Sequence, residues 1–272
     1  MDKLRDKVIV LTGASEGIGR ALAKELARPG NKLALAARDE ERLQSLKEEV
    51  EAKGAEALVV PTDITDENAC KTLIDRAVEE FGRLDVLINN AGMTLWTMVD
   101  DIEDLSIFER IMRVNYLGAV YCTAYALPHL KKTKGRIVGV SSSLGLLPAP
   151  THSAYCGSKY AMFGFFDTLR IEIKKTGVTV TMIAPGFVKT EIHNRALDRH
   201  GKPLGKSPVE KDIYMSAEKA ATMIAGAIEK RKRLLVMDVR IKIARFLHLI
   251  MPGTIESIME REFEDATGGK TF

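Results

Sequence analysis

Cysteine is scarce in this chain of 272 residues, which contains only three. Cys70, Cys122 and Cys156 follow neither the spacing of a metal-binding motif nor a paired pattern. Disulfide-stapled domains of secreted proteins usually carry more cysteines, in even numbers. We therefore expect a protein of the reducing cytoplasm, and we predict no metal site.

Long apolar runs are also missing. No stretch reaches the roughly 18 consecutive apolar residues of a transmembrane helix. Residues 1–7 are mostly charged and lead directly into an apolar run that begins at Val8. We expect no signal segment ahead of the fold.

A strong excess of charge of one sign is absent as well. The formal net charge is only +3 at pH 7, and aromatic residues make up 6% of the chain. A nucleic-acid-binding surface would need a basic patch, commonly interleaved with aromatic side chains. We therefore expect no nucleic-acid partner.

Short apolar segments alternate along the chain with longer segments of helical periodicity. This alternation is typical of βαβ units, in which helices cover both faces of a parallel sheet. Because 46% of the residues are hydrophobic, we predict one α/β domain over residues 1–272, a Rossmann-like doubly wound parallel sheet of about seven strands. The strands are expected at Val8 to Leu11, Lys32 to Ala37, Glu56 to Val60, Leu84 to Ile88, Arg136 to Ser141, Thr179 to Ile183 and Arg233 to Met237.

Two turns with glycine follow expected strands. They are Thr12-Gly13-Ala14-Ser15-Glu16-Gly17-Ile18-Gly19 and Asn89-Asn90-Ala91-Gly92. Glycines between a strand and a helix let the backbone and the helix N-terminus approach a pyrophosphate. The first turn is therefore predicted to bind a dinucleotide, although a tight turn without a ligand could carry the same glycines.

A Tyr-x-x-x-Lys unit lies further along, at Tyr155 and Lys159, with Ser142 upstream. Positions i and i+4 share one face of a helix, so we expect the Lys159 ammonium beside the Tyr155 phenol, where it would lower the pKa of the phenol. Together with the two turns, these residues resemble the short-chain dehydrogenase/reductase family over roughly Lys7 to Met237. The resemblance implies an oxidoreductase that interconverts a carbonyl and an alcohol by hydride transfer.

The resemblance also implies four catalytic residues. Tyr155 would be the general acid and base, Lys159 would support it and hold the nicotinamide ribose, and Ser142 would donate a hydrogen bond to the substrate oxygen. The backbone carbonyl of Asn115 would anchor a water that links Lys159 to solvent. Three of them have plainer alternatives. Ser142, one of three consecutive serines, could merely cap or solvate a turn, Tyr155 could be a core or surface aromatic, and Asn115 could be a turn residue.

The coenzyme contacts implied by the resemblance run along several strand ends. Asp63 and Ile64 would hold the adenine, although Asp63 could instead cap the next helix. The Val188 backbone and the Thr190 hydroxyl would fix the nicotinamide carboxamide. The full set is Gly13, Ser15, Glu16, Gly17, Ile18, Gly19, Arg38, Asp63, Ile64, Asn90, Ala91, Gly92, Tyr155, Lys159, Pro185, Gly186, Val188 and Thr190.

The end of the second strand favours NADP(H) over NAD(H). Ala37-Arg38 stands where an NAD enzyme would carry an acidic residue for the ribose hydroxyls. The Arg38 guanidinium can fork onto phosphate oxygens, and the Ser15 hydroxyl could add a donor. The alternative is that Arg38 forms a surface ion pair with Asp39 or Glu41.

The last third of the chain is expected to shape the substrate site. Residues 185–215 are predicted to form a substrate lid, and residues 238–272 a C-terminal helical extension. Ile243, Phe246, Leu247 and Ile250 have the spacing of an apolar helical stripe, and a second stripe runs from Ile255 to Phe263. These helices could cap the pocket or pack at a subunit interface. Because the segment from Lys230 to Arg245 is strongly basic, they could instead contact an anionic membrane surface.

We predict NADP(H)-dependent conversion of an apolar ketone or aldehyde, such as a steroid, retinoid, fatty acyl or long-chain ketone. Two alternatives remain, an NAD-dependent alcohol dehydrogenase of the same family and a non-catalytic NADP-binding sensor or scaffold protein. The resemblance also implies a homodimer or homotetramer. His152 either lines the substrate pocket or lies exposed in a loop.

Overall fold

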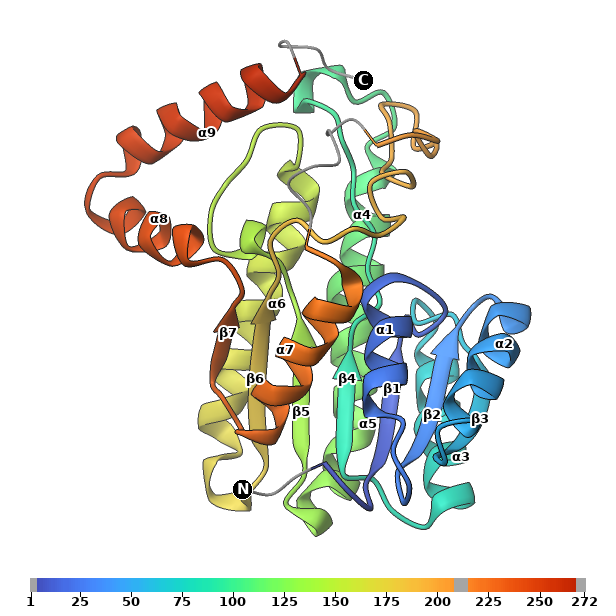
Figure 1. Cartoon of the computed structure of the whole chain (residues 1–272). Coiled ribbons are helices and arrows are strands. Elements are labelled where there is room, and N and C mark those ends of the chain that lie inside the picture. Colours follow the sequence, from blue (N-terminus) through green and yellow to red (C-terminus); the bar gives the residue numbers. More distant parts are fainter. Residues whose placement is uncertain (1–3, 208–214, 268–272) are drawn as a thin grey trace.

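The computed structural model describes residues 4–207 and 215–267. In this part of the chain, seven parallel strands form one sheet in the order β3-β2-β1-β4-β5-β6-β7 (Figure 1). The strands are β1 (Val8–Thr12), β2 (Lys32–Ala37), β3 (Glu56–Pro61), β4 (Val86–Asn89), β5 (Arg136–Val140), β6 (Thr179–Ala184) and β7 (Leu234–Val236). The predicted fold class is confirmed, and the predicted strand ends differ by two residues at most.

The strand order reverses between β1 and β4. From β1 the chain builds outward to β2 and β3 and then returns to place β4 on the other side of β1. In open α/β sheets the loops diverge at such a point, and their divergence leaves a crevice at the carboxyl ends of the strands. Both glycine turns lie there, because the first follows β1 and the second follows β4.

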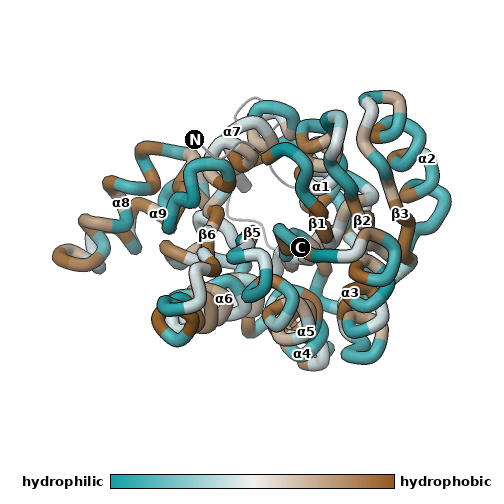
Figure 2. The backbone as a smooth tube through the Cα atoms, turned by 90° about the horizontal axis from the view of Figure 1, so that it is seen from below, coloured by the Kyte–Doolittle hydropathy of each residue, from teal (hydrophilic) through white to brown (hydrophobic). Residues whose placement is uncertain are grey.

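Helices cover both faces of the sheet, as Figure 2 shows in a view along the strands. On one face, α1 (Gly17–Leu26), α2 (Glu40–Glu51) and α7 (Ala217–Glu229) bury one set of strand side chains. On the other face, α3 (Glu67–Phe81), α5 (Gly118–Thr133) and α6 (Ser153–Glu172) bury the other set. The short α4 (Ser106–Met112) leads into α5 through a π-helical turn, η2 (Arg113–Leu117). Because both faces are covered, the strands read as continuous apolar runs.

Cys70 of α3 and Cys122 of α5 lie together in the core, although their sequence spacing did not suggest it. Both are buried free thiols. A hydrogen bond with Cys70, together with burial, raises the pKa of Cys122 well above its usual value. Both thiols therefore pack as small apolar groups.

The C-terminal helices α8 (Val239–Ile250) and α9 (Pro252–Thr267) form an arm beyond β7. In Figure 1 the arm projects sideways along α8 and then returns along α9 above the carboxyl edge of the sheet. Pro252 does more than end α8, because it is also the first residue of α9, a position that suits its fixed φ and missing N–H. No helix in the described part of the chain is long and apolar enough to span a bilayer.

Candidate functional site

One large cavity opens at the carboxyl edge of the sheet, with a volume of about 1750 Å³. Its walls come from the two glycine turns, the ends of β2, β3, β5 and β6, the start of α6, the lid and the arm. The structure brings every predicted coenzyme residue into this wall, and Ser142, Tyr155 and Lys159 as well. Asn115 is the exception among the predicted site residues, because it lies behind the wall.

The first glycine turn has the geometry of an anion cradle. Gly13 and Gly17 have φ angles of +64° and +54°, in the left-handed region that favours glycine. A Cβ atom at Gly19 would lie 2.0 Å from the carbonyl oxygen of Gly13, so the turn can close only with glycine there. Glu16 is the N-cap of α1, but its side chain does not bond to the first-turn amides. Those amides, at the positive end of the helix dipole, suit a pyrophosphate.

Thr12 ties the two glycine turns together, and the predicted site residues did not include it. Its hydroxyl accepts hydrogen bonds from the amides of Asn90, at 3.0 Å, and Ala91, at 3.2 Å. The Asn90 amide nitrogen donates in return to the carbonyl oxygens of Thr12, at 3.1 Å, and Gly13, at 3.0 Å. Thr12 stands in the turn motif itself, so its place was visible in the sequence, but its partner 78 residues away was not.

Arg38 lies exposed at the rim of the cavity. The alternative in which it pairs with Asp39 or Glu41 is not observed. Asp39 instead binds Arg42, with 3.1 Å between Nε and the carboxylate, and the side chain of Arg38 makes no hydrogen bond or ion pair within the described residues. The guanidinium is therefore free to meet an anion that enters the cavity.

Glu16 links the glycine turn to the lid. Its carboxylate accepts from Arg42 of α2 at 2.7 Å and from Arg195 of the lid at 2.9 Å. Close to a coenzyme phosphate, an unpaired carboxylate would repel the ligand. The two guanidinium groups oppose this effect at Glu16.

Asp63 follows β3 and lies exposed in the cavity wall beside the buried Ile64. Its carboxylate accepts from the Thr65 amide at 2.9 Å and from the Thr65 hydroxyl at 2.8 Å. The alternative in which Asp63 caps the next helix is wrong, because Asp66 is the N-cap of α3 and accepts from the amides of Asn68 and Ala69. Asp63 therefore closes its own turn, and it still lines the cavity where the adenine was predicted.

The segment after β6 is the start of the predicted lid, of which residues 208–214 lie outside the described part of the chain, and it lines the cavity. Val188 pairs with Met215 in a short parallel bridge. The two hydrogen bonds of this bridge use the Phe187 carbonyl and the Lys189 amide, so they do not use the N–H and C=O of Val188 itself. A Cβ atom at Gly17 would lie 3.0 Å from the Thr190 methyl. Thr190 therefore sits directly over the first glycine turn, as its predicted role requires.

Tyr155 stands in the second half of the first turn of α6, and its side chain is almost fully buried. Burial raises its pKa to about 12, and a hydrogen bond from the Ser142 hydroxyl acts in the opposite direction. Ser142 follows β5 as the N-cap of a short 3₁₀ turn, η3 (Ser143–Gly145), and also accepts from the Leu144 amide at 3.1 Å. The structure thus joins Ser142, rather than Ser141 or Ser143, to the tyrosine.

Lys159 lies one turn further along α6, and its Nζ is 5.6 Å from the centroid of the Tyr155 ring. This Nζ donates to the Val140 carbonyl at 3.1 Å. Burial without a carboxylate partner lowers the pKa of Lys159 to about 7. Burial is the main influence on the pKa of the Tyr155 phenol, and the lowering expected from Lys159 together with an oxidised nicotinamide stays a prediction.

Asn115 is fully buried in the π-helical turn η2. Its amide nitrogen donates to the Met93 carbonyl and to the Ser158 hydroxyl, both at 2.9 Å, and its side-chain oxygen accepts from the Met93 amide at 2.8 Å. Asn115 therefore fastens α6 to the turn after β4. The alternative in which Asn115 is a simple turn residue is wrong, whereas the predicted role of its backbone carbonyl stays a prediction.

His152 lies in the cavity wall just before α6, and the alternative of an exposed loop residue is wrong. Only 6% of the residue is exposed. Its ring makes an edge contact with Trp96, with 4.7 Å between the centroids, and a wider one with Tyr155, at 6.2 Å. Burial lowers the pKa of His152 to about 4, so the imidazole is neutral near pH 7.

The arm closes the cavity from above. Apolar side chains of α8 and α9, among them Leu247, Ile255 and Met259, line it, and Phe263 packs against Trp96. The predicted stripe on α8 divides, because Leu247 faces the cavity whereas Phe246 and Ile250 are exposed. The arm is therefore part of the cavity wall, and one apolar face of α8 is left exposed.

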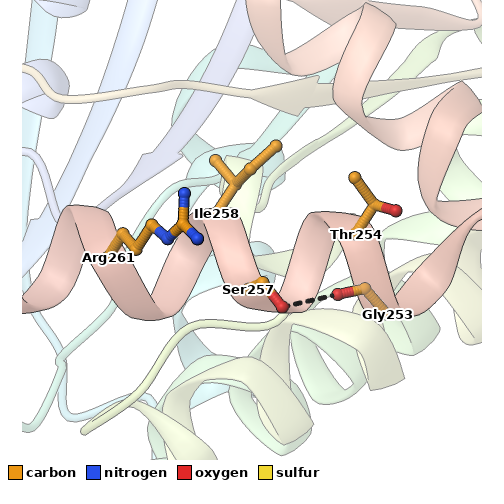
Figure 3. A pocket seen from close by; sticks show the side chains of 5 residues that line it. All are labelled: Gly253, Thr254, Ser257, Ile258 and Arg261. Atoms are coloured by element: carbon orange, nitrogen blue, oxygen red, sulfur yellow. Dashed lines mark hydrogen bonds between the residues drawn. The ribbon is translucent and has the colours of Figure 1, made fainter.

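A second pocket, of about 340 Å³, lies on α9 beside the large cavity (Figure 3). It is lined by Gly253, Thr254, Ser257, Ile258 and Arg261. The Ser257 hydroxyl donates to the Gly253 carbonyl at 3.0 Å within the same helix. No polar groups from other elements converge on this pocket in the described structure, so we assign it no function.

Comparison with known proteins agrees with this geometry. A model of the short chain dehydrogenase family matches residues 7–200. The chain belongs to the short-chain dehydrogenase family. Among its relatives is the "11-beta-hydroxysteroid dehydrogenase-like 2" protein of Arabidopsis thaliana, which is 39% identical over 192 residues. That match covers 70% of this chain and 62% of the relative, so a large part of the relative lies outside it.

Two solved structures show the same fold with a bound dinucleotide. A short chain dehydrogenase/reductase from Burkholderia phymatum in complex with NAD has a TM-score of 0.81 at 27% identity, covering 91% of this chain and 94% of that one. An alcohol dehydrogenase from Thermococcus sibiricus complexed with 5-hydroxy-NADP has a TM-score of 0.75 at 27% identity, covering 85% and 95%. As a short-chain dehydrogenase, the protein is an oxidoreductase with a nucleotide-binding Rossmann fold.

Sequence reasoning missed several parts of this short-chain dehydrogenase site. Trp96, Arg42 and Arg195 were not predicted, and His152 was left undecided. None of them stands in a motif whose spacing reveals its partner. Trp96 is the only tryptophan of the chain, and that rarity was the one signal that could have drawn attention to it.

Proposed function

We propose that this short-chain dehydrogenase interconverts an apolar ketone or aldehyde and its alcohol, with NADP(H) as the coenzyme and Tyr155 as the general acid and base. One observation carries the proposal. Ser142, Tyr155 and Lys159 lie together in the wall of a cavity that the first glycine turn also lines. When bound, the nicotinamide would supply or accept the hydride.

The protonation states of the site favour reduction near neutral pH. With a pKa of about 12, the Tyr155 phenol keeps its proton and can donate it to a carbonyl oxygen. Ser142 is placed to donate a hydrogen bond to the same oxygen. Lys159, with a pKa of about 7, can take up and release a proton near neutrality and so restore the phenol.

Arg38 supports NADP(H) as the preferred coenzyme. The guanidinium lies at the cavity rim at the end of β2, and no carboxylate neutralises it within the described residues. Arginine can bind phosphate oxygens with two parallel hydrogen bonds. The alternative coenzyme is NAD(H), since structural neighbours bound to NAD and to NADP have the same fold.

The substrate class follows from the cavity walls. The lid and the arm contribute mainly apolar side chains, such as Phe187, Leu247, Ile255, Met259 and Phe263. Such walls suit a steroid, a retinoid, a fatty acyl compound or another long-chain ketone. The name of the Arabidopsis relative supports a ring compound of the steroid type within this group.

Tyr155→Phe tests the catalytic part of the proposal. The variant keeps the ring but removes the acidic proton, so we expect carbonyl reduction to fall about a hundredfold or more, while coenzyme binding persists. Tyr160→Phe is the matched control, because Tyr160 is a half-exposed tyrosine of the same helix outside the cavity wall. Full activity in Tyr155→Phe would refute the assignment.

The non-catalytic alternative predicts a different result. A sensor or scaffold protein would bind the coenzyme, but it would reduce no carbonyl compound and oxidise no alcohol across a broad panel. Wild-type turnover that depends on Tyr155 excludes this alternative.

The assembly of the protein and its relation to membranes stay predictions. Phe246, Leu249 and Ile250 form an exposed apolar face on α8, and Lys242 and Arg245 on the same helix are also exposed. This face suits either of the predicted contacts, one with a second subunit of a homodimer or homotetramer and one with an anionic membrane surface.

A further inference from the structure

Thr151 holds a strained, buried backbone position between Pro150 and His152, two residues that line the cavity. Its φ is 64°, in the left-handed region that a β-branched residue rarely adopts. Such strain persists only where the surrounding structure enforces it, and it concentrates at functional sites. Here the carbonyl of Thr151 accepts a hydrogen bond from the Thr97 amide at 3.0 Å.

The strained position fixes the proton of the His152 ring on Nδ1. This atom lies 2.9 Å from the Pro150 carbonyl, which can only accept. It also lies 3.0 Å from the Thr151 hydroxyl, whose own hydrogen is directed to the same carbonyl at 2.6 Å. Both partners therefore require Nδ1–H. In a neutral imidazole the other nitrogen, Nε2, is then a pure acceptor.

The Nε2 atom of His152 has no hydrogen-bond partner in the described part of the chain, and the protein does not enclose it. The residue lines the large cavity. Trp96 and Tyr155 contact its ring edge-on and limit its rotation. The ring of His152 is thus held in one orientation. Its Nε2 acceptor lies in a largely apolar wall, next to Tyr155, the residue assigned to proton transfer.

We propose that His152 Nε2 accepts a hydrogen bond from a hydroxyl group of the substrate close to the reacting carbonyl. His152 is then a specificity residue, and the preferred substrates are apolar hydroxy ketones. This inference rests on the proposed function. A ketone without the hydroxyl would desolvate Nε2 and leave it unpaired, which a site built for a hydrogen bond penalises.

Valeroin, an aliphatic acyloin with its hydroxyl beside the carbonyl, tests this inference against its deoxy analogue and its methyl ether. All three are apolar ketones, but only valeroin carries a hydroxyl donor. Binding is read from the fluorescence of Trp96, the single tryptophan of the chain, and reduction from the oxidation of NADPH or NADH. In the wild type we expect valeroin to bind about three to ten times more tightly than either analogue.

Variants of His152 distinguish the effect of the hydrogen-bond acceptor from the effect of the ring's shape. His152→Gln can place its side-chain oxygen near the position of Nε2 and should keep the preference for valeroin. His152→Asn is too short, and His152→Phe has no acceptor, so both should reduce the preference to about one. His129→Asn, the same change in a histidine of α5 outside the cavity wall, should leave the preference at its wild-type value.

The outcomes distinguish this inference from the proposed function. A preference in binding that depends on His152, without turnover of any ketone, would support the hydrogen bond and refute the dehydrogenase activity. Reduction of all three ketones with equal binding would leave the activity intact and overturn the role of His152. Equal binding of valeroin and its methyl ether to the wild type overturns that role even if a variant fails to fold, and so does the absence of any fluorescence change.

Discussion

Lys159 should make the stability of the coenzyme-free protein depend on pH. Its pKa is about 7 in the folded protein, against a usual value of 10.5. Between pH 7 and pH 10.5, Lys159 is therefore protonated in the unfolded chain and mostly unprotonated in the folded protein. Because stability rises with pH wherever the unfolded state binds more protons, burial of Lys159 destabilises the fold fully below pH 7 and less as the pH rises toward 10.5.

The magnitude follows from the two pKa values. One pKa unit corresponds to about 1.4 kcal/mol, so the lysine costs about 4 kcal/mol of stability at pH 7 and about 2 kcal/mol at pH 9. Lys159→Met removes the titrating group and keeps a side chain of similar length. It also deprives the Val140 carbonyl of its donor, which destabilises the variant to the same extent at both pH values. The free energy of unfolding of the variant relative to the wild type should therefore fall by about 2 kcal/mol from pH 7 to pH 9.

Urea unfolding of both proteins without coenzyme, followed by circular dichroism at the two pH values, measures this change. Other titrating groups are common to both proteins and cancel in the difference. Lys132→Met, at an exposed lysine of α5, should show a difference that is independent of pH. If the difference for Lys159→Met is equally independent of pH, the lysine is not held in the low-pKa state that burial predicts, and the reasoning is refuted.

Two further predictions concern the coenzyme site. Arg38→Asp should weaken NADPH binding about tenfold or more and leave NADH binding unchanged, as measured by nicotinamide fluorescence. The control is Arg76→Asp, at an exposed arginine of α3. If both coenzymes bind equally more weakly to Arg38→Asp, Arg38 is not a phosphate ligand. Gly19→Ala should weaken both coenzymes and lower the melting temperature, because its Cβ would meet the Gly13 carbonyl at 2.0 Å, and an unchanged thermal transition would show that the turn is less constrained than the structure indicates.

The sequence was sufficient for the sheet and for the residues that gather at its carboxyl edge. Strands such as Val8–Thr12 and Arg136–Val140 are buried at every position and mainly apolar, because helices cover both faces of the parallel sheet. Gly13 and Gly17 stood out because a left-handed backbone requires glycine locally. These properties depend on nearest neighbours along the chain, and the sequence records them directly.

Protonation and pairing required the tertiary structure. The i, i+4 spacing of Tyr155 and Lys159 put them on one face of a helix, but it could not show that burial raises the pKa of the phenol. Similarly, spacing could not show whether Asp63 or Asp66 caps α3, because that depends on which backbone amides point back toward each carboxylate.

The sequence alone therefore determined the α/β fold and the set of residues, Ser142, Tyr155 and Lys159 among them, that line one cavity with the glycine turns. Only the tertiary structure decided that the C-terminal arm lines the cavity and that His152 lies buried in its wall. The physical reason is distance along the chain. Periodicity and turn chemistry act between near neighbours, whereas the ring of His152 packs against Trp96, which is distant in the sequence and which only the fold brings to it.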